Sequence, residues 1–375
     1  MNTINRMREE YCKRRMNVLY YPLNEDILES DPLKVKLYKC GLNTGNLIWA
    51  NAVKKNILYE ELWRNDKRYL EDNIIIPMAN DLNPYNSIIE MYRDKVLKSG
   101  NAVRVTILGL GTQLSEELNT PQKLVKALPD ERIRALHDFS EHAKYLGIRG
   151  WITAECLDLM GIHNYKVIGC PSFYTHRNNP PKFGKATTER VCISWGGDWK
   201  KEQYIKELFR KNKKQGDALI MQSMEDLPKA LFEDEPILER HIKNRYPDLE
   251  VDPLELFQYI KETAHMFFDE ETWEDFLVHG KFTMATGCRF HGNMKAWLMG
   301  IPALWVVHDS RTRELCEVMK LPNISIGRAA RVVEREEFTD FCNYDEDFYE
   351  NYQELYCRYV NFLNGNDIKI RQDES

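Results

Sequence analysis

The feature that most limits the fold is an alternation, along most of the 375 residues, of short apolar runs with segments of helical periodicity. Strands that alternate with helices in this way are typical of parallel sheets covered by helices. The runs expected to form strands lie at 16–21, 74–77, 103–108, 166–169, 191–195, 218–222, 282–285 and 303–307. The predicted fold class is therefore α/β, with two Rossmann-like domains facing a central cleft.

The middle of the chain contains the candidate for a domain linker. Residues 173–188 carry few large apolar side chains, two prolines and a pair of threonines, a composition typical of connections between domains. We predict an N-terminal domain over 1–180 and a C-terminal domain over 181–340. The remaining residues, 341–375, are expected to form a helix that packs back on the body. Aromatic residues recur there at spacings of three or four, which describes one packed face: Tyr349, Tyr352, Tyr356, Tyr359 and Phe362.

Composition excludes several classes of protein. A net charge of −6 argues against a general nucleic-acid binder. The nine cysteines include no CxxC pair, so we expect buried thiols in a reducing cytosol and neither a disulfide framework nor a zinc site. No apolar run approaches the roughly 18 residues of a membrane span. The basic N-terminal segment lacks the apolar core of a secretory signal, and it could contact anionic lipid headgroups.

The strongest candidate for chemistry follows the apolar run at 282–285. Within 286–293, Arg289 and His291 lie between two glycines at a predicted strand-to-helix turn. Ligands of parallel sheets bind beyond the carboxyl ends of strands, where helix N-termini attract anions. Arg289 can form a two-pronged contact with a carboxylate or a phosphate. His291 can pass a proton near neutral pH, and Gly292 permits the close approach of a ligand.

A second turn, at 308–313, also follows a predicted strand. Asp309 or Ser310 can cap the helix that begins there, and Ser310 is also a candidate for substrate contact. Arg311 or Arg313 could point at the same anion as the arginine of the first turn. The sequence leaves the choice between these two arginines open.

Two helix starts in the first half are weaker candidates. Arg149 lies between glycines, where it could bind an anion or could be a surface arginine paired with Glu155. Asn43, Gly45 and Asn46 begin another predicted helix. They could hold a polar ligand or form a plain N-cap.

Several well-known active-site motifs are absent from the sequence. The glycine loop at 109–112 lacks the GxGxxG spacing of a dinucleotide fingerprint. The P-loop, the GxSxG elbow, HExxH and the EF-hand loop are missing as well. We therefore expect no metal and no cofactor.

Blocks of sequence in both halves point to a family. They read IRGWITAE at 148–155, VIGCPS at 167–172, RFHG at 289–292, GIP at 300–302 and HDSR at 308–311. In their order and spacing, over about residues 40–320, they resemble the polysaccharide pyruvyl transferase family. The resemblance implies a fold like that of glycosyltransferases of type B.

The resemblance also implies an activity, the transfer of a pyruvyl group from phosphoenolpyruvate to two hydroxyls of one sugar, with formation of a cyclic ketal. Arg149 falls on an arginine of the family, and Arg289 and His291 fall on its Arg-x-His pair. Arg311 stands where relatives often carry a lysine, and Trp151 where many carry an acidic residue. His291, as general acid, and Arg289 are the expected catalytic residues. The expected substrate-binding residues are Arg149, Arg311, Asn43, Gly45, Asn46, Gly292 and Ser310.

The implied acceptor is a sugar of a bacterial surface polysaccharide, such as a capsule or exopolysaccharide, or a lipid-linked oligosaccharide precursor. The expected location is cytoplasmic, with peripheral contact at the inner face of the membrane as a further possibility, and no oligomeric state is predicted. Two other functions remain open. One is a nucleotide-sugar glycosyltransferase in the same type of cleft, and the other is a non-catalytic glycan-binding relative.

Overall fold

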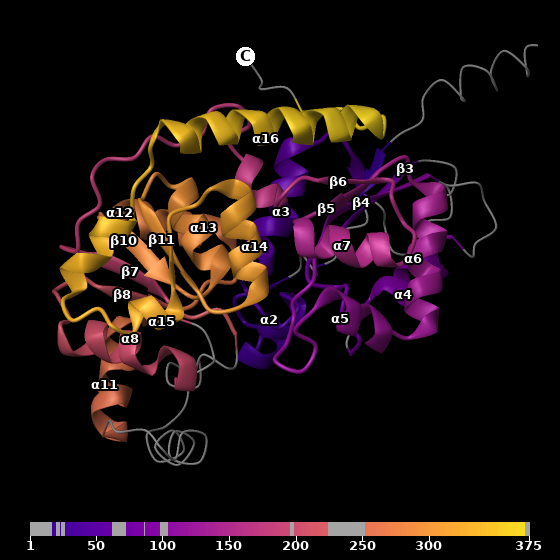
Figure 1. Cartoon of the computed structure of the whole chain (residues 1–375). Helices are drawn as coiled ribbons and strands as arrows, with labels where there is room; N and C mark the ends of the chain where they lie inside the picture. Colours follow the sequence, from indigo (N-terminus) through magenta and orange to yellow (C-terminus); the bar gives the residue numbers. More distant parts are fainter. Residues whose placement is uncertain are drawn as a thin grey trace, which may run out of the picture. The chain divides into compact units, whose positions relative to one another are not determined.

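The structure is a computed structural model that describes residues 17–19, 23, 27–61, 73–85, 87–97, 104–195, 199–223 and 252–371. These residues form two compact units (Figure 1). The first unit takes the described residues within Met1–Pro22, Ala52–Arg177 and Gln353–Ser375. The second takes those within Leu23–Asn51 and Asn178–Tyr352.

The first unit is built on one six-stranded parallel sheet, in the order β2-β1-β3-β4-β5-β6. Its strands are β1 (Asn17–Leu19), β2 (Glu60–Glu61), β3 (Asn73–Pro77), β4 (Arg104–Leu110), β5 (Leu146–Ile148) and β6 (Tyr165–Val167). All five residues of β3 are buried, as expected for a strand covered on both faces. The helices of this unit include α4 (Ile89–Val96), α5 (Pro121–Ala127), α6 (Asp130–His142), α7 (Trp151–Leu159) and the 3₁₀ helix η2 (Pro171–Tyr174).

The second unit has its own six-stranded parallel sheet, in the order β12-β11-β10-β7-β8-β9. Its strands are β7 (Val191–Ser194), β8 (Ala218–Ile220), β9 (Ala264–His265), β10 (Met284–Gly287), β11 (Ala303–Val307) and β12 (Asn323–Ser325). Numbered within the unit and read from β9, this is the 3-2-1-4-5-6 order of a Rossmann sheet. The strand order therefore reverses between β7 and β10.

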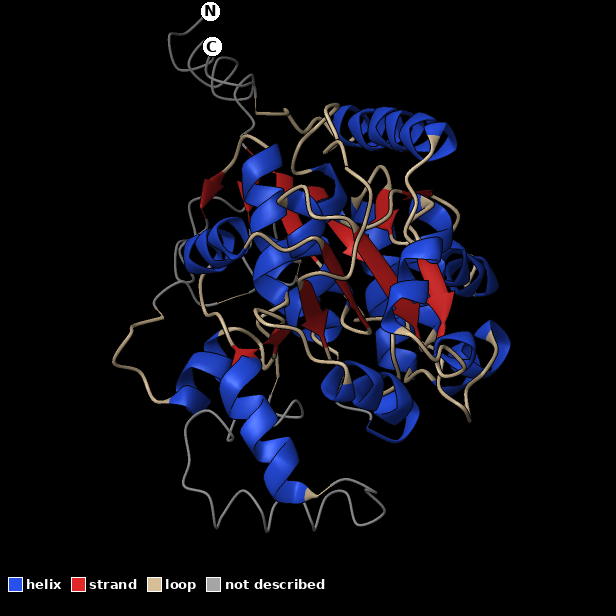
Figure 2. Ribbon diagram, turned by 90° about the vertical axis from the view of Figure 1, so that its left-hand side faces the viewer, coloured by secondary structure: helices blue, strands red, loops and turns tan. Residues whose placement is uncertain are grey.

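Helices flank the strands of the second unit (Figure 2). They are α2 (Leu33–Lys39), α8 (Trp199–Lys211), α11 (Pro253–Thr263), α12 (Glu270–Gly280), α13 (Phe290–Leu298), α14 (Ser310–Met319), α15 (Ile326–Ala329) and the 3₁₀ helix η4 (Arg335–Phe341). Two helices belong partly to each unit, namely α3 (Asn46–Asn56) and α16 (Glu346–Gly365). Trp273, Trp297 and Trp305 are fully buried in the second unit.

The predicted aromatic face of the last helix is confirmed. Tyr352, Tyr359 and Phe362 of α16 are buried. The ring of Tyr359 stacks on that of Tyr174, with centroids 4.4 Å apart. Burial raises the pKa of the Tyr359 hydroxyl well above its usual value, so the ring is neutral in its packed position.

The fold agrees with the predicted class and departs from the predicted boundaries. Each of the eight apolar runs overlaps a strand, and both sheets are parallel and Rossmann-like, so the α/β prediction is confirmed. The predicted cleft stays a prediction. The chain passes from the first unit to the second at 177–178, within the predicted linker, but residues 23–51 belong to the second unit instead of to a domain over 1–180. The helix predicted within 341–375 is likewise divided, with Tyr352 in one unit and Gln353 in the other.

The described part of the chain contains eight of the nine cysteines. Seven of the eight described cysteines are buried, Cys357 is exposed, and all eight are free thiols. No helix within the described ranges is long and apolar enough to cross a membrane. Residues 1–16, which carry most of the basic segment predicted to contact lipid, lie outside the described residues.

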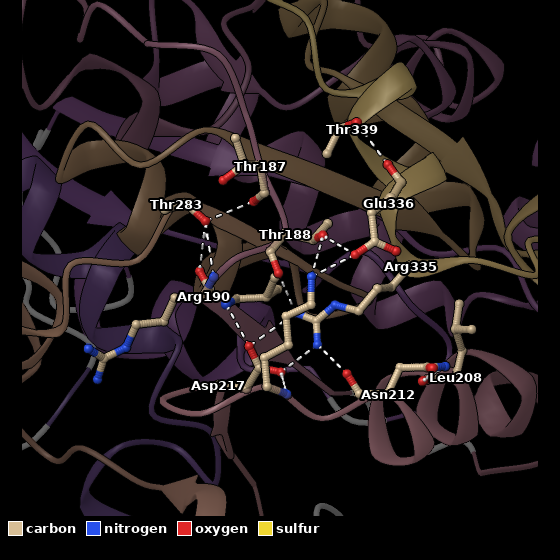
Figure 3. Close-up of polar contacts among 12 residues, drawn as sticks. Thr187, Thr188, Arg190, Leu208, Asn212, Asp217, Thr283, Arg335, Glu336 and Thr339 are labelled. Atoms are coloured by element: carbon tan, nitrogen blue, oxygen red, sulfur yellow. Dashed lines mark hydrogen bonds and ion pairs between the residues drawn. The ribbon is translucent and has the colours of Figure 1, made fainter.

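A buried ion pair ties η4 to the second sheet (Figure 3). The guanidinium of Arg335 donates to both carboxylate oxygens of Asp217, at 2.6 and 3.1 Å, and both side chains are only 1% exposed. The same guanidinium donates to the carbonyl oxygens of Asn212, at 2.6 Å, and Thr188, at 3.0 Å. Asp217 also accepts the amide of Val191, the first residue of β7, at 2.9 Å. The pair therefore fixes the start of the central strand against η4.

Candidate active site

The candidate site lies at the carboxyl edge of the second sheet, where its strand order reverses. Arg289, which follows β10, donates its backbone amide to the carbonyl of Ser194, the last residue of β7, at 3.2 Å. Its guanidinium donates from Nε to the carbonyl of Trp195 at 3.3 Å and from Nη2 to Oγ of Ser223 at 2.7 Å. Arg289 thus spans the ends of β10, β7 and β8. In doubly wound sheets this switch point is the usual ligand site.

Two glycines allow the turn after β10 to pack closely on the end of β7. Gly287 has a φ of +137°, and a Cβ there would lie 2.1 Å from the carbonyl oxygen of Ser194. A Cβ on Gly292 would lie 2.2 Å from Oγ of Ser194 and 2.3 Å from Nε2 of Gln222. Only glycine fits at either position without a shift of its neighbours. Gly292 therefore brings the first turn of α13, with Arg289 and His291, onto the ends of β7 and β8.

The turn before α3 packs against the same edge. The backbone amide of Thr44 donates to the carbonyl of Gln222 at 2.8 Å. A Cβ on Gly45 would lie 2.4 Å from Oε1 of Gln222 and 3.1 Å from Cβ of His291. The structure therefore brings Asn43 and Gly45, predicted to bind substrate from within the first domain, into the unit that carries His291.

The two asparagines of this turn serve the turn itself. Oδ1 of Asn43 accepts the amide of Gly45 at 2.9 Å, as in an Asx turn. Nδ2 of Asn46 donates to the carbonyls of Cys40 and Gly41, at 3.0 and 3.2 Å. Its Oδ1 accepts Nε1 of Trp49 at 3.0 Å. The amide of Asn46 thus holds the helix start in place, and its predicted contact with substrate stays a prediction.

The start of α14 follows β11 at the same edge of the sheet. Asp309 is its N-cap and accepts the amide of Thr312 at 2.6 Å, while Ser310 is the first helical residue. Arg311 places Nη2 3.5 Å from Oδ2 of Asp309, and Nε2 of His308 lies 3.4 Å from the same oxygen. Burial alone would raise the pKa of Asp309, but Arg311, His308 and the Thr312 contact together hold it below its usual value. Asp309 is therefore ionised, and its negative charge orients the guanidinium of Arg311.

Arg149 lies at the carboxyl edge of the first sheet, and it is only 1% exposed. Its Nε donates to the carbonyl of Gly109 at 2.8 Å and its Nη2 to that of Met78 at 3.4 Å. The interpretation as a surface arginine is therefore wrong, and Glu155 accepts a hydrogen bond from Gln122 at 2.8 Å. The guanidinium joins the ends of β3 and β4, and its predicted contact with substrate stays a prediction.

The comparisons with known proteins bear on this edge of the sheet. The model of the polysaccharide pyruvyl transferase family matches residues 17–310. The chain belongs to the polysaccharide pyruvyl transferase family. The match includes the turn with Arg289 and His291 and the turn before α3, and it ends at Ser310, one residue before Arg311. The family match supports a transferase that modifies a polysaccharide.

Other comparisons add little to the family match. No curated protein matches the chain. An uncharacterised protein from Klebsiella pneumoniae is 11% identical over 84% of this chain and 94% of its own, with a TM-score of 0.42. The protein Os79 from O. sativa, solved with UDP, is 12% identical over 96% and 95%, with a TM-score of 0.39. A putative UDP-N-acetylglucosamine 2-epimerase from Listeria monocytogenes is 11% identical over 91% and 79%, with a TM-score of 0.38. Similarities this low carry no functional argument.

Three residues at the carboxyl edge of the second sheet were not among the site residues predicted from the sequence. Ser194, Gln222 and Ser223 are buried, and each contacts or closely approaches Arg289 or Gly292. The hydroxyl of Ser194 is buried with no hydrogen-bond partner among the described residues. Gln222 ends a predicted strand, Ser223 follows it, and Ser194 is the next-to-last residue of another, so the rule that ligands bind beyond strand ends could have found them. The described residues contain no group of three or more His, Cys, Asp or Glu side chains placed to hold a metal ion.

His265, which ends β9, makes stability depend on pH. Burial lowers the pKa of its imidazole below the usual 6.5, and its ring lies 4.3 Å from that of Phe276. The imidazole of His265 therefore binds a proton more readily in the unfolded chain than in the folded one. The stability that the neutral imidazole contributes is complete above pH 6.5 and is lost as the pH falls toward the folded pKa. We expect His265→Gln to lose less unfolding free energy than the parent between about pH 7.5 and about 5.5 in urea titrations. His279→Gln, at an exposed position, is the control, and equal losses in parent and His265→Gln would contradict the prediction.

Proposed function

We propose that this protein transfers the pyruvyl group of phosphoenolpyruvate to two hydroxyls of one sugar in a polysaccharide or lipid-linked precursor, forming a cyclic ketal. The observation that carries the proposal is the placement of Arg289 and His291 together at the strand-order reversal, in a chain of this family. Phosphoenolpyruvate carries about three negative charges at neutral pH, on a carboxylate and a phosphate, and arginines are suited to both groups. The proposed location is the cytoplasm.

The proposed steps use side chains of the second unit. A sugar hydroxyl adds to C2 of the donor while His291, as general acid, delivers a proton to the methylene carbon. The second hydroxyl then forms the other C–O bond at C2 as the C–O bond to phosphate breaks. The proton of the first hydroxyl restores the protonated form of His291, and the proton of the second leaves with the inorganic phosphate. Arg289, held by Trp195 and Ser223, stabilises the charge on the departing phosphate. Arg311, oriented by Asp309, is the proposed second contact to the donor, and no metal or cofactor enters these steps.

The direct test incubates the full-length protein with phosphoenolpyruvate and candidate acceptor saccharides. Inorganic phosphate release together with a mass gain of about 70 Da on the acceptor, the acid less one water, would support the proposal. Release of a nucleoside diphosphate from a nucleotide sugar would identify a glycosyltransferase instead. Saccharide binding without turnover of either donor would indicate a non-catalytic relative.

His291→Ala tests the proposed general acid. Loss of a positioned proton donor should lower the transfer rate by about a hundredfold or more, measured as phosphate released per minute at saturating donor. His279→Ala, at an exposed helix position, should retain the parent rate. Ketal formation at the parent rate by His291→Ala would remove this residue from the mechanism.

Gly292→Ala tests the close packing of the turn. The added Cβ must displace Oγ of Ser194 or Nε2 of Gln222, and Ser194 also accepts the backbone amide of Arg289. A displacement of the order of 1 Å should lower kcat/KM for phosphoenolpyruvate by about a hundredfold. Gly184→Ala is the matched control, because a Cβ there meets no atom within 4 Å. Equal kcat/KM in the two variants would show that the tight contact has no catalytic role.

A further inference from the structure

The first unit contains an open groove of about 770 Å³ beside α16 that plays no part in the proposed reaction. It lies near the beginning of β5, because Lys144 and Tyr145 immediately precede that strand, whereas Arg149 follows it. The other lining residues come from β6 and α16. They are Lys166, Gln353, Glu354, Cys357, Arg358, Asn361, Phe362 and Gly365.

The groove is basic although the whole chain has a net charge of −6. Its lining includes three cationic side chains, Lys144, Lys166 and Arg358, and one carboxylate, Glu354. Within the residues that the structure describes, none of the three cations forms an ion pair with a carboxylate. Three cations and one carboxylate give the lining an excess of positive charge, and a concave surface with an excess of one charge raises the local concentration of oppositely charged ligands. The charge therefore favours an anionic ligand.

An aromatic ring, that of Tyr145, forms part of the groove near the two lysines. The ammonium groups of Lys166 and Lys144 lie 4.8 and 6.0 Å from the ring centroid of Tyr145, within reach of cation–π attraction. The backbone amide of Tyr145 donates to Oδ1 of Asn366 at 3.1 Å. A Cβ on Gly365 would lie 3.2 Å from Cε2 of the ring. These contacts hold the ring of Tyr145 in place, and the two exposed lysines extend to it.

Size and composition distinguish between possible anions. A volume of 770 Å³ is in the range of sites for ligands of several rings, and it is much larger than a bare ion requires. Polybasic sites for anionic membranes use clusters of about four to eight Lys and Arg, whereas this groove has three with a carboxylate among them. The amides of Gln353 and Asn361 can bond to hydroxyls, and the Tyr145 ring offers an apolar surface to a sugar.

We propose that this groove binds an anionic saccharide, a short glycan that carries a carboxylate or a phosphate. Arg358 and the two lysines contact its charged group, and the amides and the Tyr145 ring contact its sugar. The proposal draws on membership in a polysaccharide-modifying family and does not depend on the donor or on the ketal chemistry.

Cys357 provides a reporter inside the groove. It is the one exposed thiol among the eight described cysteines, so its alkylation by iodoacetamide should slow when a ligand fills the groove. Cys12, which lies outside the described residues, is replaced by serine in all proteins of the experiment. The full-length protein is probed, without phosphoenolpyruvate, with a glucuronate-containing disaccharide, glucose 6-phosphate, neutral maltose and inorganic phosphate. Anionic phospholipid vesicles are tested separately by sedimentation.

The expected result is slower alkylation of Cys357 with one or both anionic sugars, and no change with maltose or phosphate. Protection by the glucuronate-containing disaccharide would indicate recognition of a carboxylate, and protection by glucose 6-phosphate would indicate recognition of a phosphate. Lys166→Ala and Arg358→Ala should each raise the Kd by about tenfold, the loss of one charge-assisted contact. Lys126→Ala, an exposed lysine of the same unit on α5, should leave the Kd unchanged. An unchanged Tm in each variant excludes misfolding as the cause.

Several outcomes would overturn the proposal. Equal protection by maltose would remove the role of charge, and equal protection by inorganic phosphate would reduce the groove to an unspecific anion site. Binding of vesicles with no protection by either anionic sugar would assign the groove to a membrane surface. No protection by any probe at millimolar concentration would reject a saccharide site. Because no donor is present, none of these outcomes bears on the proposed pyruvyl transfer.

Discussion

Replacing Arg289 with alanine should reduce phosphate release from phosphoenolpyruvate, in the presence of an acceptor, by about a hundred- to a thousandfold. This is the usual loss when one preorganised donor to a developing charge is removed. The guanidinium lies half-buried across the ends of β7 and β8, held by the Trp195 carbonyl and the Ser223 hydroxyl. Its direction is thus set before the donor arrives, and no reorganisation is required when the phosphate departs. The measurement is kcat with a coupled phosphate assay.

Two further variants show whether the loss comes from lost charge or from lost geometry. Arg289→Lys keeps the charge but cannot form the two-pronged contact, so its activity should fall between those of the parent and the alanine variant. Arg331→Ala removes an exposed arginine of the same unit and should have the parent kcat. Parent activity in Arg289→Ala would contradict the proposed site at the strand-order reversal.

Replacing Arg335 with methionine should lower the unfolding free energy by about 3–5 kcal/mol, because it leaves the carboxylate of Asp217 buried without its partner. The side chain of Asp217 is 1% exposed, and both of its oxygens accept hydrogen bonds from the guanidinium (Figure 3). Methionine keeps much of the apolar length of the side chain, so the loss reports mainly on the charge. Urea unfolding followed by the fluorescence of Trp273, Trp297 and Trp305, all buried in this unit, measures the effect.

The neighbouring ion pair of Lys214 with Glu336 provides the control for this prediction. Both side chains are largely exposed, and their charged atoms lie 2.6 Å apart. Lys214→Ala should therefore cost less than about 1 kcal/mol, and it leaves intact the backbone amide that Asp217 accepts at 2.9 Å. In the double variant Arg335→Met with Asp217→Asn, part of the loss should be recovered, since no uncompensated charge stays buried. Equal losses in Arg335→Met and Lys214→Ala would show that burial adds nothing to this pair.

Much of the second sheet could be predicted from the sequence because its central strands are continuous apolar runs. Residues 191–195 and 303–307 read as buried strands, and both form strands. Edge strands give a weaker pattern. Asn323–Ser325 is exposed at both ends and buried only at Ile324, so no apolar run marks it. Ala264–His265 has two residues, too few for a periodicity to be recognised.

The candidate site was predictable only where its residues follow one strand. Arg289, His291 and Gly292 occupy a single turn, so the order of strand, turn and helix was enough to place them. The contact between Thr44 and Gln222 joins residues far apart in the sequence, and no local pattern encodes such a pairing. Arg149 shows a further limit, because a hydrophilic side chain between glycines gives no sign that it is buried against backbone carbonyls.

The interleaving of the two units has a consequence for synthesis on the ribosome. The first unit includes residues of Gln353–Ser375, and the second begins with residues of Leu23–Asn51. Domains of many proteins fold one after another as the chain emerges, the N-terminal one first. Here the first unit lacks the last part of α16 until the whole of the second unit has been made, while the earliest part of the second unit must wait for strands made much later. Neither unit can therefore be obtained as one continuous piece by a single cut of the chain near its middle.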